Sequence, residues 1–280
     1  MGKFEGVLLA SDFDNTLIYT EDALRAGTSV PELSKGNRQA LEYFIAGGGR
    51  FAVSTGRALA AFERYVPTLP INAPCVVCNG AAIYDFRQRR YLAAELLDAS
   101  ALEQGQAVLD AFPDLACEVY HVDNHIHTVH PNDITRRHQH MTHVDMEERI
   151  SLPEVPLPVE KLLLEGERNE LEKAVGFFRE RRWAGQYELI FSSPYLLEMT
   201  APGANKGGMV LRLAELLGIR AEDLYCAGDQ ANDLPMLAVA AEGFAPENCI
   251  DAVRQSGATM VADARNDAVA EIISILDQRY

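Results

Sequence analysis

The sequence has little positive charge, no long apolar run and few cysteines, and each shortage excludes a class of protein. Its 280 residues carry a formal net charge of −16, so we expect no basic surface for nucleic acid or for an anionic membrane. No stretch approaches the roughly 20 apolar residues that a membrane-spanning helix needs. The segment 1–5 also lacks the apolar core of a signal peptide. We therefore expect a cytoplasmic protein whose partners include neither nucleic acid nor a membrane.

The five cysteines do not suggest a disulfide framework, because their number is odd and most lie within apolar runs. Cys75 and Cys78 form a C-x-x-C pair, which raises the alternative of a redox or zinc site. A thioredoxin-like pair would open a helix, whereas this one lies in a strand-like run. We interpret the cysteines as small buried apolar side chains.

The most informative segment that is present follows the apolar run 7–10 and reads Ser-Asp-Phe-Asp-Asn-Thr over residues 11–16. A short apolar run of this kind predicts a buried β-strand that delivers Asp12 and Asp14 to its carboxyl end. Ligands bind at that end of the strands in open α/β sheets. The pair suits one carboxylate as a nucleophile and the other as a proton carrier, with a hard cation between them.

Strands and helices alternate on both sides of this motif and predict an α/β fold with a Rossmann-like parallel-sheet core. Hydrophobic residues make up 48% of the chain, enough for a sizeable core. The predicted core strands are 51–53, 75–78, 224–227 and 258–261, and the predicted core helices are 35–46, 58–65, 206–217 and 267–277.

The alternation is less regular between residues 84 and 195, where the pattern predicts a separate α+β module inserted into the first domain. We therefore predict a core formed by 1–83 and 196–280, with an inserted domain over 84–195. Its predicted strands are 116–122, 126–129, 161–164 and 188–191, and its predicted helices are 100–112, 132–141 and 168–182.

Four polar clusters in chain order resemble the motifs of the haloacid dehalogenase-like (HAD) superfamily of aspartate-dependent phosphohydrolases. They are Asp12-x-Asp14-x-Thr16, then Ser54-Thr55-Gly56-Arg57, then Lys206, and finally Gly228-Asp229-x-x-Asn232-Asp233. The insertion resembles the type-2 cap of that superfamily. Asn79-Gly80 and Asn205-Lys206-Gly207 are similar to the Cof-type branch of sugar-phosphate phosphatases. The resemblance covers essentially the whole chain, through motifs in the core and through architecture alone in the cap.

The resemblance implies that Asp12 attacks phosphorus and forms an aspartyl-phosphate, and that Asp14 carries the proton. It also implies a Mg²⁺ ion held by Asp12, Asp229 and the main-chain carbonyl of Asp14. Charge supports the metal independently, because several aspartates that meet an anionic phosphate without a cation would repel it strongly.

The same resemblance supplies the expected phosphate-binding and substrate-binding residues. Thr55 and Lys206 are expected to act in catalysis by binding the non-bridging phosphoryl oxygens. Ser54 competes with Thr55 for this role, Arg57 is either a phosphate-side cation or a solvated helix residue, and Asn79 either faces the site or turns the chain. Asn232 and Asp233 are expected to orient the nucleophile, Lys206 or the water ligands of the metal. The full expected binding set is Thr16, Thr55, Gly56, Arg57, Asn79, Lys206 and Asn232.

Two features depart from the family pattern or stand outside it. Asn15 occupies a position where many relatives carry glycine, and asparagine tolerates the left-handed backbone that such a turn needs. All seven histidines lie between His121 and His143. We expect His125 and His127 to share one face of a strand, either as a second metal site or a substrate-facing surface, or as part of a polar hairpin.

These observations predict a Mg²⁺-dependent phosphomonoesterase that acts on small phosphorylated metabolites, with sugar phosphates as the first choice and a monomer or homodimer as the assembly. A phosphomutase of the same superfamily would keep the same motifs, so it stays an alternative. A phosphometabolite-binding protein without turnover is a further alternative from another class. The cap would exclude water and select the leaving group.

Overall fold

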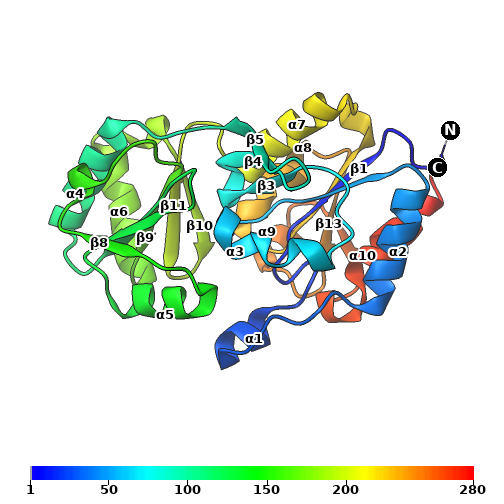
Figure 1. The fold of residues 1–280 in the computed structure, drawn as a ribbon, viewed down its shortest axis with the longest axis horizontal. Helices are drawn as coiled ribbons and strands as arrows, with labels where there is room; N and C mark the ends of the chain where they lie inside the picture. Colours follow the sequence, from blue (N-terminus) through cyan, green and yellow to red (C-terminus); the bar gives the residue numbers. More distant parts are fainter. Residues whose placement is uncertain (1) are drawn as a thin grey trace.

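Five parallel strands form the sheet around which the larger lobe is built (Figure 1). The computed structural model describes residues 2–280. The strand order is β14-β13-β12-β1-β2, and all four pairings are parallel, as the alternation of strands and helices predicts. The bounds are β1 Leu8–Ser11, β2 Arg50–Val53, β12 Leu224–Ala227, β13 Glu242–Pro246 and β14 Thr259–Val261.

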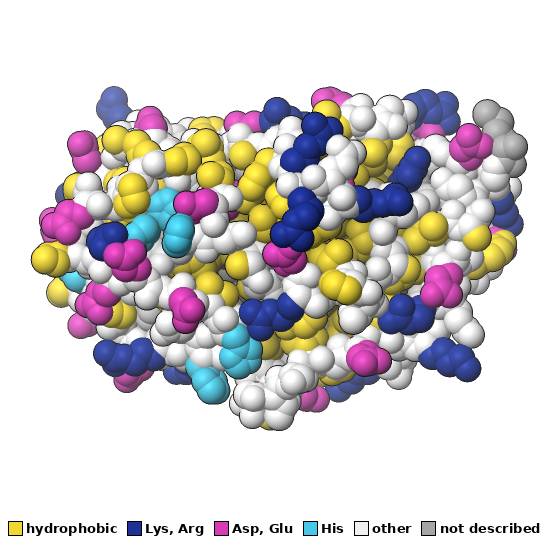
Figure 2. Space-filling model, viewed as in Figure 1, with side chains coloured by type: hydrophobic (Ala, Val, Ile, Leu, Met, Phe, Trp, Pro, Cys, Tyr) yellow, Lys and Arg dark blue, Asp and Glu magenta, His cyan; other side chains and the backbone are white. Residues whose placement is uncertain are grey.

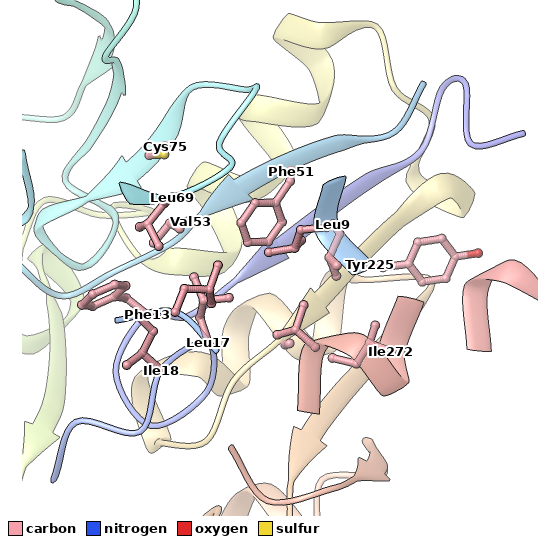
Figure 3. Close-up of a cluster of buried hydrophobic side chains, with 14 of the residues drawn as sticks. Leu9, Phe13, Leu17, Ile18, Phe51, Val53, Leu69, Cys75, Tyr225 and Ile272 are labelled. Carbon is pink, nitrogen blue, oxygen red and sulfur yellow. The ribbon is translucent and has the colours of Figure 1, made fainter. Parts of the chain in front are cut away.

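The interior strand β1, between β12 and β2, is buried on both faces because helices cover both sides of the sheet. Leu9 packs in the cluster with α2 (Lys35–Ala46) and α10 (Ala268–Asp277), and Figure 3 shows it beside Phe51 and Ile272. Leu8 and Ala10 pack on the opposite side. There they meet residues of α7 (Lys206–Leu217) and α8 (Leu234–Val239). Since the helices cover the faces of the sheet, the carboxyl end of β1 is left accessible.

The predicted third strand of the parallel sheet is placed differently. β3 (Cys75–Val77) leads a separate antiparallel sheet with β4 (Ala82–Asp85) and β5 (Arg90–Ala94). Only one parallel bridge, Ser54 with Val76, links it to the end of β2. β3 therefore lies parallel beside the end of β2, where the backbone N–H of Thr55 donates to the carbonyl of Val76 at 2.9 Å, while its other edge pairs with β4.

The second lobe is built on a six-stranded sheet in the order β10-β11-β9-β6-β7-β8, and we refer to it as the cap. Helices α4 and α6 pack on one face with the alternate strand residues Val119, Leu162 and Met199. The predicted strands and helices of this region are confirmed to within a few residues, whereas β8 and β11 were not predicted. The bounds are α4 Ala99–Ala111, β6 Ala116–Tyr120, β7 Ile126–Val129, α5 Asp133–Thr142, β8 Glu147–Arg149, β9 Lys161–Glu165, α6 Arg168–Glu180, β10 Glu188–Ser193 and β11 Leu196–Thr200.

The division of the chain at 83/84 and 195/196 stays a prediction. By sheet membership, β11 belongs with the cap strands, and β4 and β5 contribute residues to the two clusters of the larger lobe. Three short helices complete the fold: α1 (Glu21–Ala26), α3 (Leu59–Glu63) and α9 (Asp251–Arg254). Within residues 2–280, no helix has the length and apolarity to cross a membrane.

The cysteines and the turn after Asp14 agree with the sequence analysis. All five cysteines are buried free thiols. Asn15 has a φ of 56°, in the left-handed region. Its side-chain oxygen accepts hydrogen bonds from the backbone N–H groups of Thr20 (3.1 Å) and Glu21 (3.0 Å). The side chain thus fixes the start of α1, which a glycine could not do.

Only one of the two histidines expected on one strand face belongs to a strand. β7 begins at Ile126, so His125 falls in the preceding turn, where its exposed imidazole bonds Asp123. The buried His127 contacts His121, with Nδ1 and Nε2 2.9 Å apart. In Figure 2 the visible histidines lie over the cap half of the molecule. The predicted strand 126–129 is confirmed, and it leaves His125 outside the strand and exposed while His127 is buried in it.

A third histidine, His138 on α5, closes a charged cluster inside the cap. Its Nδ1 lies 2.9 Å from Oε1 of Glu118 and 3.5 Å from Oε1 of Glu165, and both carboxylates are fully buried. Burial lowers the pKa of His138, but the charge and hydrogen bond of Glu118 outweigh it and raise that pKa above 6.5. Burial and the nearby Glu118 raise the pKa of Glu165 to about 8.

Both shifts predict a cap that loses stability as the pH rises. His138 and Glu165 each bind a proton more tightly in the folded state, so the stability that this protonation gives is lost between pH 4.5 and about 8 for Glu165 and above pH 6.5 for His138. Glu165→Gln mimics the protonated acid. It is expected to raise the midpoint of thermal unfolding by a few degrees at pH 8.5 relative to wild type, and by less at pH 6.

The measurement is thermal unfolding followed by circular dichroism between pH 6 and pH 9. Glu147→Gln, at a more exposed carboxylate on β8, is the control and should follow the wild-type curve. A Glu165→Gln curve parallel to wild type over this range would contradict the assignment.

Candidate active site

The predicted site residues are brought together where β1 and β12 end. These strands pair in parallel, with Ser11 opposite Ala227, so the segments that follow them lie side by side. The backbone N–H of Asp12 donates to the carbonyl of Ala227 at 2.8 Å. Asp12 and Asp229 are both buried at this edge, as the two apolar runs predict.

Lys206 links three segments that are distant in sequence. It is the first residue of α7 and is fully buried. Its Nζ donates to Oδ1 of Asp12 at 2.8 Å and to Oδ1 of Asp233 at 2.6 Å. The positive end of the helix dipole disfavours a lysine here, and the two carboxylates outweigh it, since they raise the pKa of Lys206 despite its burial.

The second oxygen of Asp233 holds the loop after β12. It accepts hydrogen bonds from the backbone N–H groups of Asp229 and Gln230, each at 2.9 Å. The Thr16 hydroxyl, predicted to bind phosphate, donates to Oδ1 of Asp229 at 2.8 Å. The Gln230 amide donates to Oδ2 of the same carboxylate at 3.0 Å. Asp229 is therefore fixed from both sides.

The charges of this cluster do not balance. Asp12, Asp229 and Asp233 offer carboxylate oxygens within 4.8 Å of one another, and all three are buried. Burial and Asp233 raise the pKa of Asp12 well above its usual value, and the same causes raise the pKa of Asp229 to about 7. A single lysine cannot neutralise three carboxylates, so a divalent cation with oxygen ligands fits this cluster.

This acidic cluster contains two of the predicted metal ligands, Asp12 and Asp229, with Asp233 as the third acid. The side chain of Asp14 is engaged elsewhere. Its oxygens accept two parallel bonds from Nε and Nη2 of Arg57, both at 2.7 Å, and a bond from the Thr20 hydroxyl at 2.7 Å.

The guanidinium of Arg57 lies against the packed rings of Phe13 and Tyr65, 5.2 and 5.1 Å from their centroids. Burial by itself raises the pKa of Asp14, but the charge and hydrogen bonds of Arg57 outweigh it, so that pKa lies below its usual value. The structure thus excludes one of the two roles that the sequence left open for Arg57. It is a largely buried partner of Asp14 and not a solvated helix residue.

The remaining predicted residues lie on the loops beside this cluster. The buried Thr55 hydroxyl accepts a bond from the backbone N–H of Arg57 at 3.1 Å. The Asn232 amide donates to Oδ1 of Asn79 at 3.1 Å. Three buried polar atoms here lack a partner in the described part of the chain, namely Oγ of Ser54, Nδ2 of Asn79 and Oδ1 of Asn232. Unpaired buried polar atoms are rare in folded proteins, so these are candidates for binding a polar ligand.

A cavity of about 410 Å³ lies between the core and the cap, within the usual range for small-molecule sites. The sequence analysis missed several of its polar residues and two partners of the predicted carboxylates, Thr20 and Gln230. A signal existed for Lys161 and Glu198, since each is a charged residue within an apolar strand run. The core residues at the cavity include Asp12, Asp14, Gly56, Arg57 and Asn232, and the cap contributes Tyr120, His138, Lys161, Ser192 and Glu198.

Comparison with known proteins agrees with this geometry. The model of the haloacid dehalogenase-like hydrolase family matches residues 9–273. The 5-amino-6-(5-phospho-D-ribitylamino)uracil phosphatase YwtE of Bacillus subtilis is 24% identical over 296 residues, covering 96% of this chain and 97% of that protein. The pyridoxal phosphate phosphatase YbhA of Escherichia coli is 23% identical, covering 95% and 97%.

The fold has solved counterparts as well. The structure of BT4131, a sugar phosphatase of HAD subclass IIB, superposes with a TM-score of 0.80 at 18% identity, covering 96% of this chain and 98% of that one. A family model that spans nearly the whole sequence, phosphatase relatives of matching length and the same fold lead to one conclusion. The chain belongs to the haloacid dehalogenase-like hydrolase family and is a phosphatase enzyme of its Cof-type branch.

Proposed function

We propose that this phosphatase is a Mg²⁺-dependent phosphomonoesterase that hydrolyses small phosphorylated metabolites through an aspartyl-phosphate on Asp12. The observation that carries the proposal is the buried cluster in which Lys206 contacts Asp12 while Asp229 and Asp233 lie beside it, with Asp12 lining the cavity. This arrangement combines a carboxylate nucleophile with the positive charge that a phosphoryl group requires.

Asp12 and Asp229 would hold the metal together with the main-chain carbonyl of Asp14. When bound, Mg²⁺ supplies positive charge that neutralises the phosphoryl oxygens and favours ionised carboxylates. Its positive charge would also offset the excess negative charge of the three carboxylates. Without it, burial raises the pKa values of Asp12 and Asp229.

The nucleophile is oriented by Lys206, whose Nζ donates to one oxygen of Asp12 and leaves the other oxygen for attack on phosphorus. Attack forms the oxygen–phosphorus bond of the aspartyl-phosphate and breaks the bond to the leaving alkoxide. Lys206 and Thr55 would bind the non-bridging oxygens, where negative charge is held in the transition state. Asp233 keeps the lysine in place.

Asp14 would give a proton to the leaving alkoxide and then take one from the water that cleaves the intermediate. The contacts with Arg57 and Thr20 hold its carboxylate in the ionised form, which suits the second step. For the first step the carboxyl group must be protonated, so the substrate complex would loosen the Arg57 contact. Asn79, Gly56 and Asn232 would line the phosphate-binding loops.

The named relatives act on different esters, a ribitylaminouracil phosphate and pyridoxal phosphate, which supports a small phosphorylated metabolite as the substrate class. We keep sugar phosphates as the first choice, a cytoplasmic location, and a monomer or homodimer as the assembly. A phosphomutase would convert a sugar phosphate into its isomer without releasing phosphate, and a binding protein would do neither. A product assay therefore separates the three.

Asp12→Asn is expected to reduce phosphate release from p-nitrophenyl phosphate and sugar phosphates by about 10³-fold or more, because the amide is a poor nucleophile. The measurement is the steady-state rate of phosphate release with Mg²⁺, together with a circular dichroism spectrum that shows a retained fold. Asp110→Asn, at an exposed carboxylate on α4, should leave the rate unchanged. A rate within tenfold of wild type in Asp12→Asn would rule out the covalent mechanism.

Removing divalent ions with a chelator is expected to abolish activity, and added Mg²⁺ should restore it. Asp229→Asn should weaken Mg²⁺ binding on the order of tenfold or more, since it removes a charged oxygen ligand from the site. Both the activity as a function of Mg²⁺ concentration and calorimetric titration with Mg²⁺ measure this. Asp251→Asn on α9 is the control at an exposed aspartate. Full activity in the chelated protein would disprove the metal requirement.

A further inference from the structure

The cap contains a buried cluster of titratable groups that the proposed phosphatase chemistry does not use. The side chains of Glu118 on β6 and Glu165 on β9 are 0% exposed, and His138 on α5 contacts both. Ligand atoms of the three residues lie within 4.8 Å of one another. Two adjacent carboxylates that are removed from water repel each other strongly unless a cation or a proton lies between them.

Strand register brings the two glutamates together. β6 and β9 are antiparallel, with Glu118 opposite Leu163 and Ala116 opposite Glu165. Glu118 and Glu165 are therefore diagonal neighbours on one face of the sheet. That face is opposite the one packed against α4 and α6, because Val119 points the other way into the cap core. The cluster thus lies outside that apolar core, on the side of α5.

The helix α5 buries few apolar side chains against the sheet. Of its ten residues, all of which the structure describes, only Thr135 is buried. In Figure 1 this helix lies apart from α4 and α6, at the lower edge of the cap. The Thr135 hydroxyl donates to Oε2 of Glu165, and Nδ1 of His138 lies 2.9 Å from Oε1 of Glu118. The position of α5 therefore depends on polar contacts with the two glutamates.

Two hydroxyl groups hold one oxygen of each glutamate. Tyr120 donates to Oε2 of Glu118, as Thr135 does to Oε2 of Glu165. The Oε1 atoms of Glu118 and Glu165 lie 2.9 and 3.5 Å from Nδ1 of His138, and Oε2 of Glu118 lies 3.0 Å from it. Oε1 of Glu165 accepts no hydrogen bond from residues 2–280, although the side chain is fully buried. Unpaired buried polar atoms are rare, so this oxygen is a candidate ligand atom.

The spacing of these atoms fits a transition-metal ion. Nitrogen and oxygen ligands at about 2.0–2.2 Å from a cation lie about 2.9–3.5 Å apart in octahedral or tetrahedral geometry. The two distances from Nδ1 of His138 to the Oε1 atoms match this range. An imidazole ligand favours zinc-like ions over Mg²⁺ and Ca²⁺, which prefer oxygen. Tyr120 and Thr135 would orient the carboxylates, as hydrogen bonds to ligands do in other metal sites.

We propose that Glu118, His138 and Glu165 form a second metal site, in the cap, that binds a zinc-type divalent cation and fastens α5 to the sheet. One imidazole nitrogen and the carboxylate oxygens would hold the ion, and water would complete its coordination. Its two positive charges would balance the two glutamates. His138 also lines the cavity between core and cap, which gives an ion a route to the cluster. The site is separate from the proposed catalytic metal, which Asp12 and Asp229 would hold.

A proton and a metal ion are alternatives in this cluster. In the metal-free cap, a proton on Glu165 reduces the repulsion between the glutamates, as its raised pKa indicates. A bound cation would displace that proton, so the pH dependence predicted for Glu165→Gln applies to chelated protein. With Zn²⁺ bound, the same variant lacks a charged ligand and is expected to unfold at a lower temperature than wild type.

The test uses Asp12→Asn/Asp229→Asn as the background protein, because this change removes two carboxylates of the active-site cluster and leaves Lys206 paired with Asp233. The chelated and dialysed protein is titrated with Zn²⁺ alone by calorimetry at neutral pH. It is expected to bind one equivalent. Adding Glu165→Gln should weaken that binding on the order of tenfold or more. Zn²⁺ should raise the midpoint of thermal unfolding of the background protein by several degrees, and by much less with Glu165→Gln.

Two further variants in the same background separate this site from other histidines of the cap. His138→Gln keeps both glutamates and should weaken Zn²⁺ binding as Glu165→Gln does. Glu147→Gln is the control, because Glu147 lies 3.5 Å from His127, which contacts His121, and these three are the competing ligands. This control should bind Zn²⁺ as the background protein does. Circular dichroism of each variant checks that the fold is retained.

Absence of Zn²⁺ binding by the background protein would overturn the cap site, as would equal affinities with and without Glu165→Gln and His138→Gln. Loss of binding in Glu147→Gln alone would assign the ion to His121 and His127 instead. Each of these results leaves the phosphatase function intact, because phosphate release by wild type with Mg²⁺ tests that function separately.

Discussion

The crowding of buried carboxylates at the ends of β1 and β12 is the constraint on which the site depends. Asp12, Asp229 and Asp233 lie within 4.8 Å of one another and share one buried cation, Lys206. Like charges at such distances in a low dielectric are strongly unfavourable. The fold holds them because backbone N–H groups bind Asp233, the Thr16 hydroxyl and the Gln230 amide bind Asp229, and Lys206 at the start of α7 contacts Asp12 and Asp233.

This charge imbalance also explains how the fold and the proposed chemistry are connected. A site that binds a divalent cation and a phosphate must be unfavourable without them, and the raised pKa values of Asp12 and Asp229 express that cost. Because the net charge of the chain is −16, the few cations near the site must supply the positive charge that an anionic ligand needs. Lys206 contacts Asp12, Arg57 contacts Asp14, and Lys161 belongs to the cap.

The cap turns one face of its sheet to its own helices and the other to the cavity. On the helix face the residues are apolar, as in any two-layer packing. The opposite face carries charged residues among apolar ones, including Glu118 on β6, Lys161 on β9 and Glu198 on β11. The period of two along a strand thus separates the residues that pack against the helices from those on the other face.

Most strands of the core sheet could be predicted from apolar runs that end in polar motifs. These runs predicted β1, β2 and β12 and the residues at their ends, because a buried parallel strand must be apolar and its carboxyl end must be open. The left-handed turn at Asn15 also follows from local backbone preferences. Local pattern likewise predicted α2, α4 and β7, whose periodicity is strong within a single segment.

The tertiary structure alone decided which partner each group finds. β3 was predicted as a third parallel strand, and it forms a single parallel bridge beside the end of β2 and an antiparallel hairpin with β4, which its own sequence does not show. Arg57 with Asp14, Thr16 with Asp229 and Lys161 with Glu198 are pairs 43, 213 and 37 residues apart. Residue type and spacing indicate which hydrogen bonds a side chain can donate or accept. The partner is set by the packing of whole elements, and no single segment of the sequence contains that information.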